Sequence, residues 1–167
     1  MRWTLATLAL ALVALSADTA EAQRRAKPVQ PTPYDQGKVS LSLGGGFNGT
    51  NGQIGGGLGY FVIKGLEVGV EGFVTIQSDT TIGVLGPQAR YIVWQVPTIH
   101  PYIGPFYRHW FIGDEIEDRD SVGARAGIIT AQKPFYLSAG VAYERFLGCT
   151  DDNCAFVTPE INLGISF

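Results

Sequence analysis

The sequence has little charge and, beyond its N-terminus, no long apolar run. Charged residues make up 16% of the 167 residues, against roughly 25% in soluble domains. The net charge of -3 gives no electrostatic support for nucleic-acid binding. After residue 22 no apolar stretch is long enough for a transmembrane helix. Branched and aromatic residues are plentiful, which excludes a disordered chain, and the length is that of a single domain.

The first 22 residues have the layout of a secretory signal peptide. Arg2 supplies the positive end, Leu5 to Leu15 form an apolar run, and Ala20-Glu21-Ala22 fits a small-x-small cleavage site. The apolar run is too short to span a bilayer. We therefore expect cleavage after residue 22, with an uncleaved N-terminal helix as the alternative.

Residues 23–37 predict a flexible, Pro-rich leader, because they offer almost nothing apolar to bury. The charged and proline residues of this segment are Arg24, Arg25, Lys27, Pro28, Pro31 and Pro33. Its cations could touch anionic lipid headgroups. A tether without a partner is the simpler interpretation.

Both cysteines, Cys149 and Cys154, lie close together in a Cys-Thr-Asp-Asp-Asn-Cys segment. An exported chain meets an oxidising compartment, so we expect a disulfide that closes this loop. A zinc site would need four ligands, and no histidine neighbours these cysteines. We therefore expect no metal and no cofactor.

From Lys38 onward, short segments of alternating character are separated by glycine and turn residues, which predicts β-strands. The expected strands are Lys38 to Asn48, Gln53 to Ile63, Leu66 to Gln77, Ile82 to Val96, Pro101 to Ile112, Ser121 to Ala131, Phe135 to Leu147 and Ala155 to Phe167. Three connections are tight turns: Lys64-Gly65, Pro97 to His100 and Gln132 to Pro134. The other four, mostly longer and more polar, are Gly49 to Gly52, Ser78 to Thr81, Gly113 to Asp120 and Gly148 to Cys154. Short turns at one end and longer loops at the other are typical of outer-membrane barrels.

Alternation predicts two faces of opposite character but does not say which face is inside. A soluble, lipocalin-like barrel would have the apolar face inside, whereas a membrane barrel would have it outside. Lysine favours the membrane barrel, because a water-facing sheet would carry lysines along its strands. Those beyond the signal peptide lie only in the leader or at strand ends: Lys27, Lys38, Lys64 and Lys133. The many glycines on the polar face suit a crowded interior.

Aromatic residues gather toward the ends of the expected strands, which predicts two belts at the membrane interfaces. The short-turn belt would hold Tyr91, Trp94, Tyr102, Phe135, Tyr136 and Phe167. The loop-side belt would hold Phe47, Phe73, Tyr107, Trp110, Phe111, Tyr143, Phe146 and Phe156. Three prolines, Pro87, Pro105 and Pro159, fall inside expected strands, where we expect bulges or errors of register.

From Lys38 to Phe167 the chain resembles the OmpA- and OmpX-type eight-stranded outer-membrane barrels. The most specific element is the closing strand Ile161-Asn162-Leu163-Gly164-Ile165-Ser166-Phe167. The resemblance implies that Phe167 is the signal read by the barrel-insertion machinery. It also implies that both chain ends face the periplasm, with outer-membrane lipid and lipopolysaccharide as surroundings.

The polar parity places seven charged side chains inside the barrel, where unpaired ions would be very costly. They are Glu67, Glu71, Arg90, Arg108, Arg125, Glu144 and Glu160. A network of ion pairs that fills the lumen is the structural interpretation, and the resemblance implies the same. A gated ion path through these residues is the functional alternative, although eight strands leave little lumen.

Some barrels similar to these modify lipid A, but their catalytic patterns are missing here. The deacylase type has a serine two places after its histidine, whereas His109 is followed by Trp110 and Phe111, and His100 by Pro101 and Tyr102. The palmitoyl-transferase type begins with an amphipathic helix, whereas this leader is rich in proline. No Gly-x-Ser-x-Gly elbow occurs.

One outer loop is strongly acidic and includes a single Arg119. Its acidic residues are Asp114, Glu115, Glu117, Asp118 and Asp120. A solvated loop is the simplest interpretation. The alternative is a surface that collects divalent cations or engages a basic partner, although EF-hand spacing is missing.

Taken together, these observations predict a non-enzymatic, eight-stranded transmembrane β-barrel of the outer membrane. Its expected role is structural or surface interaction through the outer loops, with the surface partner left open. A narrow ion-conducting pore and a lipid A-modifying enzyme are the alternatives.

Overall fold

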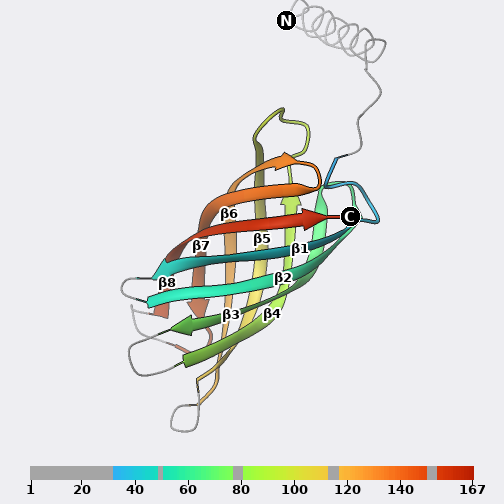
Figure 1. Cartoon of the computed structure of the whole chain (residues 1–167). Coiled ribbons are helices and arrows are strands. Elements are labelled where there is room, and N and C mark those ends of the chain that lie inside the picture. The colour runs from blue at the N-terminus through green and yellow to red at the C-terminus, as the bar shows by residue number, and fades with distance from the viewer. Residues whose placement is uncertain (1–31, 49–50, 77–80, 113–116, 150–153) are drawn as a thin grey trace, which may run out of the picture. The chain divides into compact units, whose positions relative to one another are not determined.

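The computed structural model describes residues 32–48, 51–76, 81–112, 117–149 and 154–167. Eight antiparallel strands pair in chain order, and β1 pairs with β8 to close a barrel (Figure 1). The strands are β1 (Val39–Asn48), β2 (Asn51–Ile63), β3 (Leu66–Ile76), β4 (Thr81–Ile92), β5 (His100–Phe111), β6 (Arg119–Gln132), β7 (Phe135–Phe146) and β8 (Ala155–Ser166). The predicted eight-stranded, up-and-down antiparallel barrel is confirmed.

The observed strands differ from the predicted segments mainly at their ends. β4 ends at Ile92, so the β4–β5 connection spans residues 93–99 and is longer than the predicted turn at Pro97 to His100. The Trp94 N–H donates to the Ile92 carbonyl and the Ile99 N–H to the Pro97 carbonyl. These backbone groups bond within the turn and not to a neighbouring strand, which is why the strand stops early.

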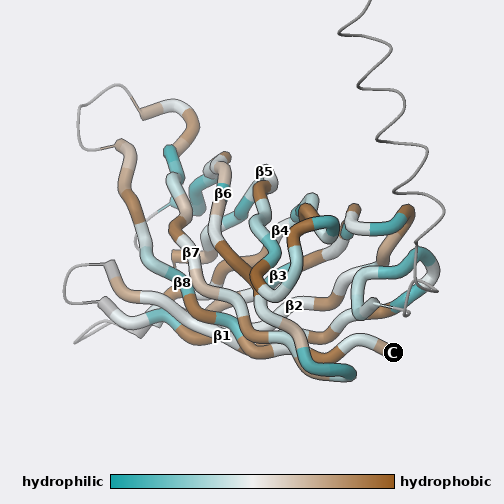
Figure 2. Tube along the Cα trace, turned by 90° about the horizontal axis from the view of Figure 1, so that it is seen from above, coloured by the Kyte–Doolittle hydropathy of each residue, from teal (hydrophilic) through white to brown (hydrophobic). Residues whose placement is uncertain are grey.

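The apolar face of the sheet points outward. Leu43, Ile54 and Ile161 expose 73%, 64% and 63% of their surface, whereas Glu71 and Arg90 expose only 3% and 6%. Along the strands, hydrophilic and hydrophobic residues alternate (Figure 2). A soluble barrel with an apolar interior would have the opposite arrangement, so the predicted orientation is confirmed.

Glycine on the inner face makes room for larger side chains from the neighbouring strands. A Cβ atom at Gly44 would overlap the Asn162 side chain, and one at Gly164 would overlap the Tyr136 ring. Both glycines share the inward parity of their strands. The barrel therefore closes tightly around its interior, as expected for eight strands.

The three strand prolines produce no bulges. β4 and β5 keep one register from Gly83↔Phe111 to Ile92↔Tyr102, with interruptions around Pro87 and Pro105. The β1–β8 ladder ends at Gly46↔Glu160, just before Pro159. Because proline lacks an N–H, the ladder is interrupted or ends beside it while the register is kept. The expected bulges and register errors were therefore wrong, and the irregularity in the β2–β3 pairing lies between Phe61 and Ile63.

The prediction of two aromatic belts was partly wrong. Four of the residues expected there are buried inside the barrel: Phe73, Tyr102, Trp110 and Tyr136. Phe146 and Phe156 pack against the Trp110 ring. Each of these residues has the inward parity of its strand, and parity decides direction irrespective of position along the strand.

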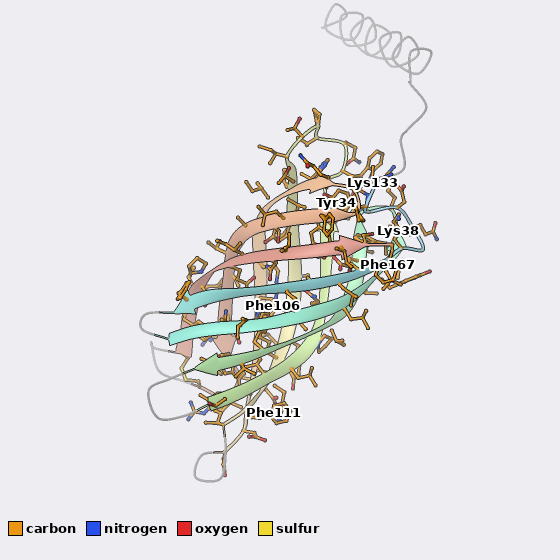
Figure 3. All side chains as sticks on the ribbon, viewed as in Figure 1. Tyr34, Lys38, Phe106, Phe111, Lys133 and Phe167 are labelled. Carbon is orange, nitrogen blue, oxygen red and sulfur yellow. A yellow bond between two sulfur atoms is a disulfide. The ribbon has the colours of Figure 1, made fainter. Side chains whose placement is uncertain are left out.

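The exposed aromatic side chains still gather at the two ends of the barrel. Phe135 and Phe167 expose 54% and 63% of their surface at the short-turn end, and Phe111 exposes 46% at the loop end. Figure 3 shows Phe167 and Phe111 at opposite ends of the barrel. Tyr60, which was not expected in a belt, is also exposed near the short turns.

Candidate functional site

The middle of the barrel interior, or lumen, is occupied by charged side chains around Arg108. The Arg108 guanidinium donates from Nε to Glu71 at 2.9 Å, from Nη1 to Glu144 at 2.6 Å and from Nη2 to Glu160 at 3.1 Å. Arg125 donates from Nη2 to Glu71 at 2.5 Å, and its Nη1 lies 3.7 Å from Glu160. These five side chains, from β3, β5, β6, β7 and β8, form what we call the central charge cluster.

Aromatic rings and short polar side chains complete the surroundings of this cluster. The Arg108 guanidinium lies 4.2 Å from the centre of the Phe106 ring and 4.8 Å from that of Phe73. Such cation–π contacts are strengthened when the cation is desolvated. Glu144 also accepts hydrogen bonds from Trp110 Nε1 at 2.9 Å and from Ser121 Oγ at 2.5 Å.

A second ion pair lies closer to the short turns. Arg90 Nε donates to Glu67 at 2.9 Å, and the Ser40 hydroxyl donates to the other carboxylate oxygen. The Arg90 guanidinium also lies 5.5 Å from the Tyr102 ring centre and 5.7 Å from that of Tyr136. All seven charged residues predicted to face inward are therefore buried, and each takes part in an ion pair.

Apolar layers close the lumen on both sides of the charges. The short-turn layer consists of Tyr34, Phe61, Ile92, Tyr102, Ile129 and Tyr136. The loop-side layer consists of Phe73, Ile82, Val84 and Trp110, with Ile112, Phe146 and Phe156 packed against it. A cavity between the charges, bordered by Glu71, Arg90 and Arg125, measures only about 10 Å³, which is close to the smallest volume that holds one water molecule.

Tyr34 belongs to the segment expected to be a flexible leader. Residues 23–31 lie outside the described part of the chain, but residues 32–37 are bound to the barrel. Tyr34 exposes only 1% of its surface, and its carbonyl accepts a hydrogen bond from the Gly65 N–H. The Pro33 carbonyl accepts one from the Ser166 hydroxyl. For residues 32–37 the prediction of a flexible leader was wrong, because an aromatic side chain in this polar, proline-rich segment packs into an apolar pocket of the barrel.

The same segment carries an ion pair at the short-turn end. Asp35 accepts hydrogen bonds from the Thr32 N–H at 2.6 Å and the Thr32 hydroxyl at 2.9 Å, and lies 3.1 Å from Lys64 Nζ. Burial acts to raise the pKa of Asp35, but the Thr32 hydrogen bonds and the Lys64 ammonium outweigh it and lower that pKa. Burial also raises the pKa of the Tyr34 phenol, which therefore stays neutral.

The loop end carries the disulfide and part of the acidic loop. Cys149 and Cys154 are joined, with their Cα atoms 5.7 Å apart, so the predicted disulfide is confirmed. Asp114 and Glu115 lie outside the described residues, whereas Glu117 and Asp118 are exposed. Asp120 is not a loop residue, because it lies in β6.

Asp120 is held against the outer wall of the barrel. The Tyr107 hydroxyl donates to Asp120 at 2.5 Å, and His109 Nδ1 lies 2.7 Å from the same carboxylate oxygen. His109 Nε2 lies 3.5 Å from Asp118. Of the five predicted acidic residues, Asp118 and Asp120 therefore contact a histidine, which links the start of β6 to β5.

Neither histidine is paired with a nucleophile in the described part of the chain. His109 contacts Asp118, Asp120 and the Phe111 ring, and His100 packs edge-on against Tyr34. Among the described residues, no group of three or more His, Cys, Asp and Glu side chains could hold a metal ion. No helix in the same residues is long and apolar enough to span a membrane.

Besides the misplaced belt aromatics, Ser40, Ser121 and Tyr34 contribute to the lumen and were not singled out in the sequence. Ser40 and Ser121 share the inward parity of the charged residues, and this parity could have identified them as partners. Tyr34 precedes the first strand, so no periodic signal marks it.

Comparisons with known proteins give likenesses of structure alone. No family model matches the sequence, and no curated protein matches it. The N-terminal β-barrel domain of Pseudomonas aeruginosa OprF superposes with a TM-score of 0.64 at 16% identity, covering 79% of this chain and 98% of that one. Neisserial surface protein A superposes with a TM-score of 0.52 at 15% identity, covering 77% and 93% of the two chains.

A chain from a study on the de novo design of transmembrane β-barrels also matches. Its TM-score is 0.57 at 16% identity, with 80% of this chain and 98% of that chain covered. Identities this low establish the fold and nothing more specific. The chain has an eight-stranded antiparallel β-barrel fold, which it shares with outer-membrane barrels.

Proposed function

We propose that this chain is a non-enzymatic outer-membrane barrel with a structural or surface-interaction role exercised through its outer loops. The observation that carries the proposal is the combination of an apolar exterior with a filled lumen. The exterior offers Leu43, Ile54, Leu163 and similar side chains to lipid. The lumen holds ion pairs between two apolar layers, so the strands form a wall around a solid interior.

The outer membrane is the proposed location. The expected signal peptide at residues 1–22 would export the chain, and Phe167 would present the insertion signal to the barrel-insertion machinery. The similarity in fold to outer-membrane barrels supports this location. Cell fractionation combined with gel mobility before and after boiling tests it, because a folded membrane barrel migrates differently from the same chain unfolded.

The outer loops are the proposed working part of the molecule. The Cys149–Cys154 disulfide stiffens the last loop, and the His109 contacts with Asp118 and Asp120 secure one end of the acidic loop. Fixing loop ends lowers the conformational entropy lost when a partner binds. Deleting the acidic loop would leave folding intact and abolish surface binding if this proposal holds.

The pore alternative is not favoured. A conducting path would have to cross the Tyr34 layer, the central charge cluster and the Trp110 layer. Planar-bilayer recordings are expected to show no stepwise conductance. Reproducible conductance steps would support the pore alternative. Mass analysis of lipid A from cells with and without the protein tests the enzyme alternative, and we expect identical lipid A.

A further inference from the structure

The short-turn end of the barrel carries positive charge that the protein leaves largely unpaired. Lys38 and Lys133 are at this end, near Phe167 (Figure 3), and Lys64 lies in the short turn between β2 and β3. Lys64 is engaged, since its ammonium lies 3.1 Å from Asp35 and 4.1 Å from the centre of the Trp94 ring. Within the described residues, Lys38 and Lys133 form no ion pair.

A groove on the outer wall lies beside the β6–β7 turn that contains Lys133. It has a volume of about 190 Å³ and crosses β6, β7 and β8. It is bordered by Thr130, Gln132, Phe135, Tyr136, Leu137 and Leu163, all of which are exposed except the buried Tyr136. We call this surface the Lys133 groove.

Strand pairing places these groove residues side by side. Thr130 is opposite Leu137, Gln132 is opposite Phe135, and Leu137 is opposite Leu163. Lys133 follows Gln132 directly, in the turn that joins β6 to β7. The groove therefore runs along the outer wall toward the turn that contains the exposed Lys133.

An aromatic ring stands beside this end of the groove. Phe167, at the end of β8, exchanges backbone hydrogen bonds with Val39, the residue after Lys38. Aromatic rings are favoured at the headgroup level of a bilayer, which places this end of the groove at the interface.

We propose that the Lys133 groove binds one anionic phospholipid, with an acyl chain along the groove and the headgroup phosphate on Lys133. The inference rests on the proposed function, since it needs the barrel to stand in a membrane. Short turns of outer-membrane barrels face the periplasm, where the adjoining leaflet consists of phospholipids. The charge complements an anionic headgroup, and the exposed walls of the groove complement an acyl chain.

Lipid titration followed by native mass spectrometry tests the proposal. The full chain, folded in detergent micelles, is titrated with phosphatidylglycerol or phosphatidylcholine of the same acyl chains. The wild-type chain is expected to retain one phosphatidylglycerol in preference to phosphatidylcholine. Lys133→Gln should weaken phosphatidylglycerol binding about fivefold, the effect of one lysine at an anionic surface, and leave phosphatidylcholine binding unchanged.

Lys64→Gln is the matched control, because it removes the same charge from the same end of the barrel. Its ammonium is already held by Asp35, so we expect phosphatidylglycerol binding to stay at the wild-type value. Equal losses in the two variants would mean diffuse electrostatic attraction and would overturn the site. Equal wild-type binding of the two lipids would overturn headgroup recognition.

Thr130→Phe tests the groove itself, since an added ring would fill it while keeping Lys133. Both lipids should then bind more weakly, and unchanged phosphatidylglycerol binding would refute the acyl-chain position. Gel mobility in phosphatidylcholine vesicles separates this proposal from the proposed function. If the chain folds there but does not prefer phosphatidylglycerol, only the lipid site is rejected. If the chain folds in no bilayer, both the lipid site and the proposed function are rejected.

Discussion

Replacing Arg108 by methionine is expected to be among the most damaging single changes in the barrel. The Arg108 side chain is 1% exposed and donates to three carboxylates at 2.6, 2.9 and 3.1 Å. After the change, Arg125 would still contact Glu71 and Glu160, but Glu144 would have no cation. Removing one partner of a buried ion pair costs about 3–5 kcal/mol. We expect the upper part of that range, because three acids share this guanidinium.

Urea unfolding of the full chain in lipid vesicles, followed by gel mobility, measures this loss. Arg145→Met is the control, because Arg145 is exposed and forms no ion pair among the described residues. Adding Glu144→Gln to Arg108→Met should recover part of the lost stability, as a double-mutant cycle would show. Only part is expected back, because Glu144 also binds Trp110 and Ser121. If Arg108→Met changes the free energy of unfolding by less than Arg145→Met, the lumen is not held by this cluster.

Three further changes probe the ends of the barrel. Tyr34→Ala should lower the free energy of unfolding by about 3–5 kcal/mol, as for buried aromatic residues. Gln36→Ala, at an exposed position in the same segment, should have little effect. Equal urea midpoints for the two variants would contradict the docking of this segment. Replacing Cys149 and Cys154 by serine should cost about 2 kcal/mol, as expected for so short a loop, and a reductant should lower the stability of the wild-type chain but not of the variant. The pKa of Asp35 is lower in the folded chain than in the unfolded one, so its stabilising contribution is complete above about pH 4 and is lost as the pH falls through the pKa of the folded state. Asp35→Asn should remove this part of the acid dependence of the free energy of unfolding. Identical pH profiles for the wild type and Asp35→Asn would refute this role of Asp35.

The closed lumen also explains the placement of aromatic residues inside the barrel. Phe106 and Phe73 lie against the Arg108 guanidinium, and Trp110 donates to Glu144. Rings in this position both fill space and stabilise the charges, which small residues could not do. The loop-side layer therefore supports the ion pairs beneath it.

The sequence by itself determined the strands and the direction of their side chains. A period of two assigns each residue to one face, and a slip by one residue would exchange the faces along a whole strand. Glu67, Glu71 and Arg90 could therefore be assigned to the interior without any structure. The scarcity of lysine along the strands was enough to choose the lipid-facing side. Cys149 and Cys154 paired as expected because the short loop keeps them close.

Only the tertiary structure decided which of these side chains meet. Arg108 binds acids that lie 36, 37 and 52 residues away in the chain, and such contacts depend on the stagger with which eight strands close. Parity alone turns Tyr102 and Trp110 inward, but only the closed barrel brings the Trp110 indole to Glu144 and the Tyr102 ring to Arg90. Tyr34 lies before the first strand, where no periodicity operates, and its place was settled by an apolar pocket that exists only once the barrel has closed.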